Sequence, residues 1–176
     1  MQKYDIYFWI AQGLSLVSIG IFVYSWSHET REDTLKFQII GNIVNISSYL
    51  FLGGYTAVAL SSVTLTRNFV YRSKTKNKWR QSPLLMYVFM VVLVVGTLYT
   101  WKGAISLFPC VACILGTYSI SLENTIKMKQ YMFLANALWI PYNVWIMAYI
   151  GILGSLTLCA FIWIFLKKEK AKRLKN

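Results

Sequence analysis

The sequence predicts an all-α integral membrane protein with seven transmembrane helices. Apolar residues make up 57% of the 176-residue chain and charged residues only 14%, whereas soluble domains carry roughly a quarter charged residues. The apolar residues gather in segments close to the length that crosses a bilayer. Sixteen of the eighteen Lys and Arg residues fall where one membrane topology puts them on a single side.

Seven spans can be drawn, with short connections between them. The first is longer than a signal-peptide core and lacks a basic leader, so we interpret it as a retained helix. Gly53-Gly54 is typical of a tight turn between the second and third spans. The join near Ala148 has no such residue before Gly151, and one broken helix in place of spans two and three is an alternative. The spans are about 4–26, 36–52, 55–71, 84–101, 103–121, 130–147 and 149–166.

Basic residues fix the expected orientation. The connection 72–83 carries five of them without an acid, and the tail after Leu166 carries six against Glu169 alone. Four spans separate these clusters, so both lie on one side, which the positive-inside rule assigns to the cytoplasm. The N-terminus is then outside and the C-terminus inside, and only Lys3 and Lys102 remain outside.

Composition also bears on partners and cofactors. The net charge of +12 lies beside the spans, where it meets the anionic lipid bilayer, so we expect no nucleic-acid partner. Cys110, Cys113 and Cys159 lie in apolar segments, and the single histidine, His28, lies in a polar loop. The sequence therefore predicts no disulfide framework, no metal site and no cofactor.

An internal repeat links the two halves of the chain. A shift of 94 residues overlays the first three spans on the last three without a gap, and loops overlay loops. This predicts a 3+1+3 arrangement of two like-facing three-helix units, with a site between them near mid-membrane; chance similarity is the alternative. The expected units are 1–75 (first repeat), 76–101 (basic loop and linking helix), 102–168 (second repeat) and 169–176 (basic tail). The identical pairs begin at positions 17, 24, 25, 27, 29, 42, 46, 55, 61 and 74.

Two stripes of polar side chains are the candidate binding residues. Span two carries Gln38 and then Asn42, Asn45 and Tyr49 at helical spacing, which places them on one face. Span six carries a second stripe at the same spacing, and the repeat pairs Asn42 with the first member of that stripe. Amides donate and accept hydrogen bonds, so facing stripes can replace the water shell of a neutral solute; alternatively, they only join helices. The second stripe consists of Asn136, Trp139 and Asn143.

Arg67 and Pro109 are further candidates. Arg67 lies about one turn before the cytoplasmic end of span three, where it either snorkels or contacts an anionic or carbonyl group of the solute. Pro109 in span five removes a backbone hydrogen bond and is a candidate hinge, or serves packing alone. The repeat partners of these residues are Phe161 and Ser15, so the two halves have diverged.

The acidic residues all lie in loops or near the termini. With no carboxylate or histidine expected deep in the membrane, the usual parts of a proton relay are missing. The sequence offers no nucleophile–base pair, metal set or phosphate loop at membrane depth, so we expect no enzyme. The acids are Asp5, Glu29, Glu32, Asp33, Glu123 and Glu169.

Several stretches resemble the bacterial inner-membrane YgjV-like family, over most of the chain. The resemblance implies a relation to the SWEET sugar facilitators, PQ-loop proteins and KDEL receptors, which share the 3+1+3 arrangement. It therefore implies a SWEET-like fold in the inner (cytoplasmic) membrane of a bacterial cell. The chain departs from the PQ-loop pattern, since neither of its span prolines precedes Gln, and it lacks the intramembrane acid of proton-coupled relatives. The stretches are Phe37–Asn42, Leu52–Ala57, Arg67-Asn68, Thr100–Pro109 and Leu138–Asn143.

The leading hypothesis is a facilitator of a small polar solute, without proton coupling, that works by alternating access between two three-helix bundles. The alternative is a non-transporting membrane receptor, immunity or accessory factor, or partner-binding protein, whose amides would satisfy one another in a packed core. The sequence is compatible with a homo-oligomer, and it does not identify the solute.

Overall fold

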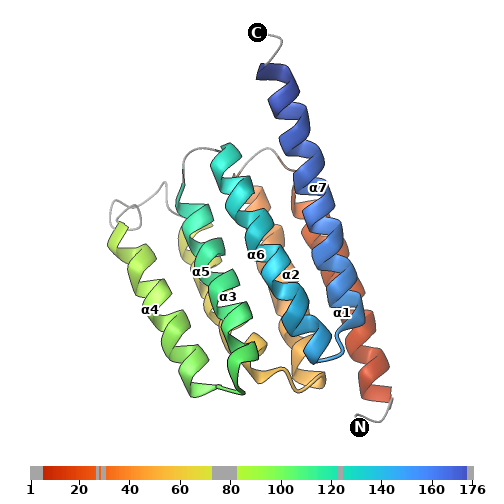
Figure 1. Ribbon diagram of the computed structural model, residues 1–176. Helices are drawn as coiled ribbons and strands as arrows, with labels where there is room; N and C mark the ends of the chain where they lie inside the picture. Colours follow the sequence, from red (N-terminus) through yellow and green to blue (C-terminus); the bar gives the residue numbers. More distant parts are fainter. Residues whose placement is uncertain (1–5, 27, 29–30, 73–82, 123–124, 174–176) are drawn as a thin grey trace.

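The computed structural model describes residues 6–26, 28, 31–72, 83–122 and 125–173 (Figure 1). Within these ranges the chain is helical and no strand occurs. A 3₁₀ turn, η3 (Ala104–Ser106), precedes the fifth of seven α-helices. The helices are α1 (Ile6–Trp26), α2 (Arg31–Phe51), α3 (Tyr55–Arg72), α4 (Pro83–Tyr99), α5 (Leu107–Ser121), α6 (Thr125–Trp145) and α7 (Tyr149–Arg173).

Each predicted span corresponds to one helix, but three of the helices are longer than the apolar segment that predicted them. Helices α2 and α6 begin at Arg31 and Thr125, five residues before the expected starts, and α7 continues to Arg173. Hydropathy marks the part of a helix that can lie in lipid, whereas backbone hydrogen bonding continues through the Lys, Arg, Glu and Ala residues that follow it, which are good helix formers.

Six helices form a closed ring. Helix α1 packs against α2 and α7, α2 against α3, α3 against α5, α5 against α6, and α6 against α7. Helix α4 stands outside this ring and packs against α3 and α5, at one edge of the molecule in Figure 1. In this ring α2 and α6, which carry the two polar stripes, occupy opposite positions.

Successive helices run in alternating directions, so α1, α3, α5 and α7 all end at the same end of the bundle (Figure 1). We call this the basic end, since Arg72, Lys127, Lys129 and Lys167 lie there. The opposite end, with the α2–α3 and α6–α7 connections, is the turn end. Most of the basic connection predicted over 72–83, and residues 174–176 of the tail, lie outside the described residues.

The two connections at the turn end share one backbone geometry. Gly53 has φ of 67° and Met147 has φ of 56°. The next residue in each case donates its N–H to a carbonyl five residues earlier, Gly54 to Tyr49 and Ala148 to Asn143, both at 2.9 Å. This is the Schellman pattern, in which a left-handed residue ends a helix. The Gly53-Gly54 turn therefore separates two helices, in place of one broken helix. At the α6–α7 connection Met147 adopts the left-handed conformation although it is not a glycine.

Three described helices are both long and apolar enough to cross a membrane on composition alone, over Ile6–Ser25, Ala104–Ser121 and Tyr149–Lys167. Helix α4 is a shorter apolar helix of 17 residues. Helices α2, α3 and α6 have 21, 18 and 21 residues, which is a sufficient length, but polar side chains lower their hydropathy. Many of those side chains, among them Asn42, Arg67 and Asn136, line the centre of the ring.

The Gly53 turn gives a test of the fold. A Cβ added at Gly53 or at Gly96 in α4 meets no atom within 4 Å, and only Gly53 has positive φ. We expect Gly53→Ala to lower the free energy of unfolding in detergent by about 1–2 kcal/mol, because a side chain is strained in the left-handed region. Gly96→Ala is the matched control and should leave stability unchanged or slightly raised. Equal effects of the two substitutions would contradict the assigned turn.

Candidate functional site

The ring encloses a cavity of about 160 Å³, enough space for several water molecules or a small solute. All six ring helices contribute to its wall and α4 contributes none. Along α3 the lining runs from Ser61 to Asn68, so the cavity occupies the middle of the bundle and continues toward the basic end. The interior therefore contains both packed helix–helix contacts and a space lined partly by polar side chains.

The structure brings all seven predicted binding residues to this one cavity. Each stripe forms one face of its helix, and the two faces meet across the ring. They are Asn42, Asn45 and Tyr49 on α2, Asn136, Trp139 and Asn143 on α6, and Arg67 on α3. Their role in binding is not decided by this placement and stays a prediction.

A hydrogen bond and a ring contact bridge the two stripes. The Tyr49 hydroxyl donates to Oδ1 of Asn143 at 3.1 Å, and the Tyr49 and Trp139 rings stack with centroids 5.9 Å apart and planes 13° apart. The close approach of Asn143 to α7 depends on Gly151, since a Cβ at that position would lie 3.2 Å from the Asn143 amide. This bridge forms the floor of the cavity on the side of the turn end.

The asparagines above the floor do not satisfy one another. Nδ2 of Asn136 donates to the carbonyl of Met132 in its own helix at 2.8 Å. Asn42 is 7% exposed and lines the cavity without a hydrogen bond to any described residue. A packed amide core, in which each group pairs with another, is not what the interior contains. These amides retain capacity for water or a solute.

Arg67 lies about one and a half turns before the end of α3 and is 4% exposed. Its Nη1 donates to Oγ1 of Thr117 on α5 at 2.9 Å, while Nε and Nη2 both donate to Oδ1 of Asn68, at 3.2 and 2.9 Å. Asn68 in turn donates to Gln38 at 3.5 Å. The guanidinium is thus held sideways against the cavity, and it does not extend to the exposed surface as a snorkelling arginine would.

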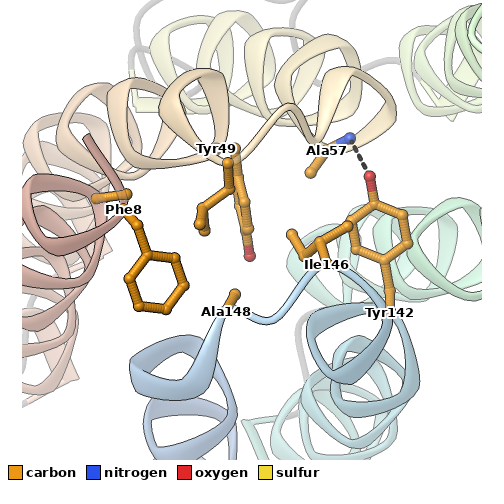
Figure 2. Packing of buried hydrophobic residues seen from close by; sticks show 8 residues of the cluster. Phe8, Tyr49, Ala57, Tyr142, Ile146 and Ala148 are labelled. Atoms are coloured by element: carbon orange, nitrogen blue, oxygen red, sulfur yellow. Dashed lines mark hydrogen bonds between the residues drawn. The ribbon is translucent and has the colours of Figure 1, made fainter. Parts of the chain in front are cut away.

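A packed cluster of buried side chains lies at the turn end, below the cavity, and Figure 2 shows its packing. It consists of buried apolar and aromatic side chains from α1, α2, α3, α6 and the α6–α7 turn. The Tyr142 hydroxyl accepts the backbone N–H of Ala57 at 3.3 Å, as Figure 2 shows. Gln12 joins α1 to the far side, donating to the Met147 carbonyl and accepting from the Ile150 N–H, both at 3.0 Å. The cluster comprises Phe8, Ala11, Tyr49, Leu52, Ala57, Tyr142, Ile146 and Ala148.

The basic end contains both an apolar cluster and a hollow. The cluster packs Leu35, Tyr71, Phe89 and Ile120 from α2, α3, α4 and α5. A second hollow of about 110 Å³ lies between α1, α6 and α7, and Leu158 lines both spaces. Nearer the cavity the α1–α7 contact is tight, since a Cβ at Gly154 would lie 2.4 Å from Ile19. The ring is therefore closed by packed side chains at the turn end, whereas the basic end is packed beside α2, α3 and α5 and looser between α1, α6 and α7.

Several residues that line the cavity were not predicted from the sequence. Serine and threonine carry little weight in a hydropathy scan, because they occur on lipid-facing surfaces and bond their own helix. Their helical spacing of three and four residues was the available signal, as it was for the asparagines. They include Ser15 and Ser18 on α1, Ser61 and Thr64 on α3, and Ser155 on α7.

Pro109 lies in the first turn of α5, where a helix tolerates proline best, because the N–H groups there have few helical partners. Its role as a hinge stays a prediction. Among the described residues no three His, Cys, Asp or Glu side chains gather at a common point, and Cys110, Cys113 and Cys159 are buried free thiols. The cavity wall thus offers a solute hydroxyl and amide groups, aromatic faces and one guanidinium.

Residues 9–172 match the family Imp-YgjV, described as a bacterial inner membrane protein. The chain belongs to this family. The match confirms the resemblance that the sequence indicated, and it places this YgjV-family member in the bacterial inner membrane as a multi-pass protein. Among curated proteins and solved structures, none matches the chain.

The Tyr49–Asn143 bridge can be measured by a double-mutant cycle. We expect Tyr49→Phe and Asn143→Leu to show a coupling energy of about 0.6 kcal/mol in unfolding, and no more than about 1.7, the range for hydrogen bonds between membrane helices. The pair Tyr49→Phe and Asn136→Leu is the control and should be additive, because these side chains make no hydrogen bond to each other. If the unfolding energies of the two substitutions were additive in both cycles, the Tyr49–Asn143 hydrogen bond would be contradicted.

Proposed function

We propose that this YgjV-family protein is a facilitator that moves a small polar solute across the inner membrane. The observation that carries the proposal is a polar cavity at the centre of the helical ring, lined by both amide stripes and sealed at one end. The cavity-facing amides of Asn42 and Asn136, which do not pair with each other, favour a solute site over the alternative of a packed receptor or accessory protein. We further propose that all seven helices cross the membrane, with the polar faces of α2, α3 and α6 turned away from lipid.

Alternating access requires two bodies that can move against each other, and a like-facing repeat supplies them. Three observations support such a repeat, α1–α3 and α5–α7, linked by α4. Nine pairs of lining residues are separated by 94 positions. The two turns with matching hydrogen bonds centre on Gly53 and Met147, also 94 apart. Tyr49 and Asn143, which bond directly, are such a pair, as expected for equivalent residues beside a twofold axis.

The 3+1+3 order is also what a relation to SWEET and PQ-loop proteins implies. In this interpretation the sealed turn end is the outer gate and the looser basic end is the inner gate. Proton coupling is not part of the proposal, because the six acidic residues lie outside the segments that line the cavity. The proposal assigns the protein no catalytic role.

Uptake into liposomes tests the proposal. We expect purified protein to accelerate entry of at least one solute in a panel of neutral, anionic and cationic metabolites. Asn42→Leu and Asn136→Leu should each lower the initial rate at least about tenfold, since each removes a hydrogen-bonding group that would face the solute. Ser62→Ala is the control, because Ser62 is exposed on α3 and bonds its own helix. A panel with no accelerated solute, or an unchanged rate in Asn136→Leu, sinks the proposal.

Cysteine labelling in intact cells tests the proposed orientation. In a variant without native cysteines, Tyr99→Cys places a thiol at the turn end, where Tyr99 is 92% exposed, and Leu122→Cys places one at the basic end. We expect a membrane-impermeant maleimide to label Tyr99→Cys directly and Leu122→Cys only after permeabilisation, since basic connections stay in the cytoplasm. The reverse pattern would invert the topology.

A further inference from the structure

The most unusual group in the cavity wall is a buried cation that has no counter-ion among the residues that the structure describes. Only 4% of the Arg67 side chain is exposed. Its hydrogen-bond partners among the described residues, Asn68 and Thr117, are both neutral. The acidic residues of the chain are at positions 5, 29, 32, 33, 123 and 169, and none of them is among the residues that line the cavity. An uncompensated charge in a low-dielectric interior is costly, so its retention calls for a compensating group.

The bonding of Arg67 leaves donors for such a group. A guanidinium has five N–H bonds, and three of them are used, one each on Nε, Nη1 and Nη2. One N–H on Nη1 and one on Nη2 make no bond to a described residue. Gly116 faces Nη1 across the wall, and a Cβ built there would lie 3.7 Å from that atom. That distance is ordinary van der Waals contact, so Gly116 leaves room beside Nη1 but a methyl group would also be accommodated there.

The rest of the cavity sets the charge and size of the partner. Asn42, Asn136 and Asn143 are neutral, so the wall carries a single positive charge and the best match is a monoanion. The volume of about 160 Å³ admits a small molecule only. The amides of α2, the helix beside Arg67, and of α6 line the same cavity and suit hydroxyl or carbonyl groups on the same molecule. Basic side chains at the looser end raise the local concentration of anions there.

We propose that the solute is a small organic monoanion, a hydroxycarboxylate, whose carboxylate binds Arg67 and whose hydroxyl groups bind the asparagines. The inference rests on the proposed function and adds the charge class. A carboxylate fits a guanidinium with two free donors and neutralises it in one step. A phosphate dianion would leave one charge unmatched in the same space.

Paired ligands test the charge class. The panel consists of hydroxycarboxylates of two to six carbons, such as lactate, beside their primary amides, such as lactamide, with inorganic phosphate as a further arm. We expect carboxylates to bind purified protein at least about thirtyfold more tightly than the amides, judged by thermal stabilisation and calorimetry. Arg67→Gln should abolish this difference. Thr117→Val, which removes a partner of Arg67 but keeps the charge, should retain it.

Electrogenic transport in wild-type protein gives a second readout that needs no variant to fold. Carboxylate uptake into liposomes should accelerate under an inside-positive potassium diffusion potential, whereas uptake of an amide should not. Equal binding and transport of amides, preference for phosphate, or carboxylate uptake that ignores the potential overturns the inference while leaving a facilitator intact. If no solute of any charge moves, the proposed function itself is overturned.

Discussion

The structure depends on one constraint: polar side chains on a membrane helix must be kept from lipid. Helices α2, α3 and α6 each carry such side chains along one face, and an exposed amide or guanidinium in hydrocarbon costs several kcal/mol. Closing six helices into a ring turns all these faces inward at once. The interior can then hold polar groups in place of one continuous apolar core. The apolar packing that remains is divided among three clusters, around Tyr142, around Tyr71 and around Leu60.

Much of this arrangement could be predicted from the sequence because lipid imposes a simple rule. Asn42, Asn45 and Tyr49 follow helical spacing within an apolar segment, so they had to share a face, and the same holds for Asn136 and Asn143. The helix count followed from apolar length. Residues that bond their own backbone, such as Ser62, obey no such rule, and that is why the serines of the wall were missed.

Other features depend on tertiary contacts that spacing does not encode. The left-handed turn at Met147 carries no glycine signal, and it is held by Gln12, which lies 135 residues earlier in the chain. The extended starts of α2 and α6 depend on helix propensity beyond the bilayer. The outward position of α4 requires knowledge of which helices meet, since its sequence alone is an ordinary apolar segment. Arg67 could be placed near one end, but its sideways contact with Thr117 required the position of α5.

The place of α4 has a mechanical consequence. Helix α4 packs on the outside of the α3–α5 contact. The α1–α7 contact on the opposite side of the ring, where Ile19 meets Gly154, has no further described helix packed on its outside. A ring supported on one side and bare on the other would bend about the supported side. Its two halves would then separate between α1 and α7. The gap that opens there would face the acyl chains of the surrounding bilayer.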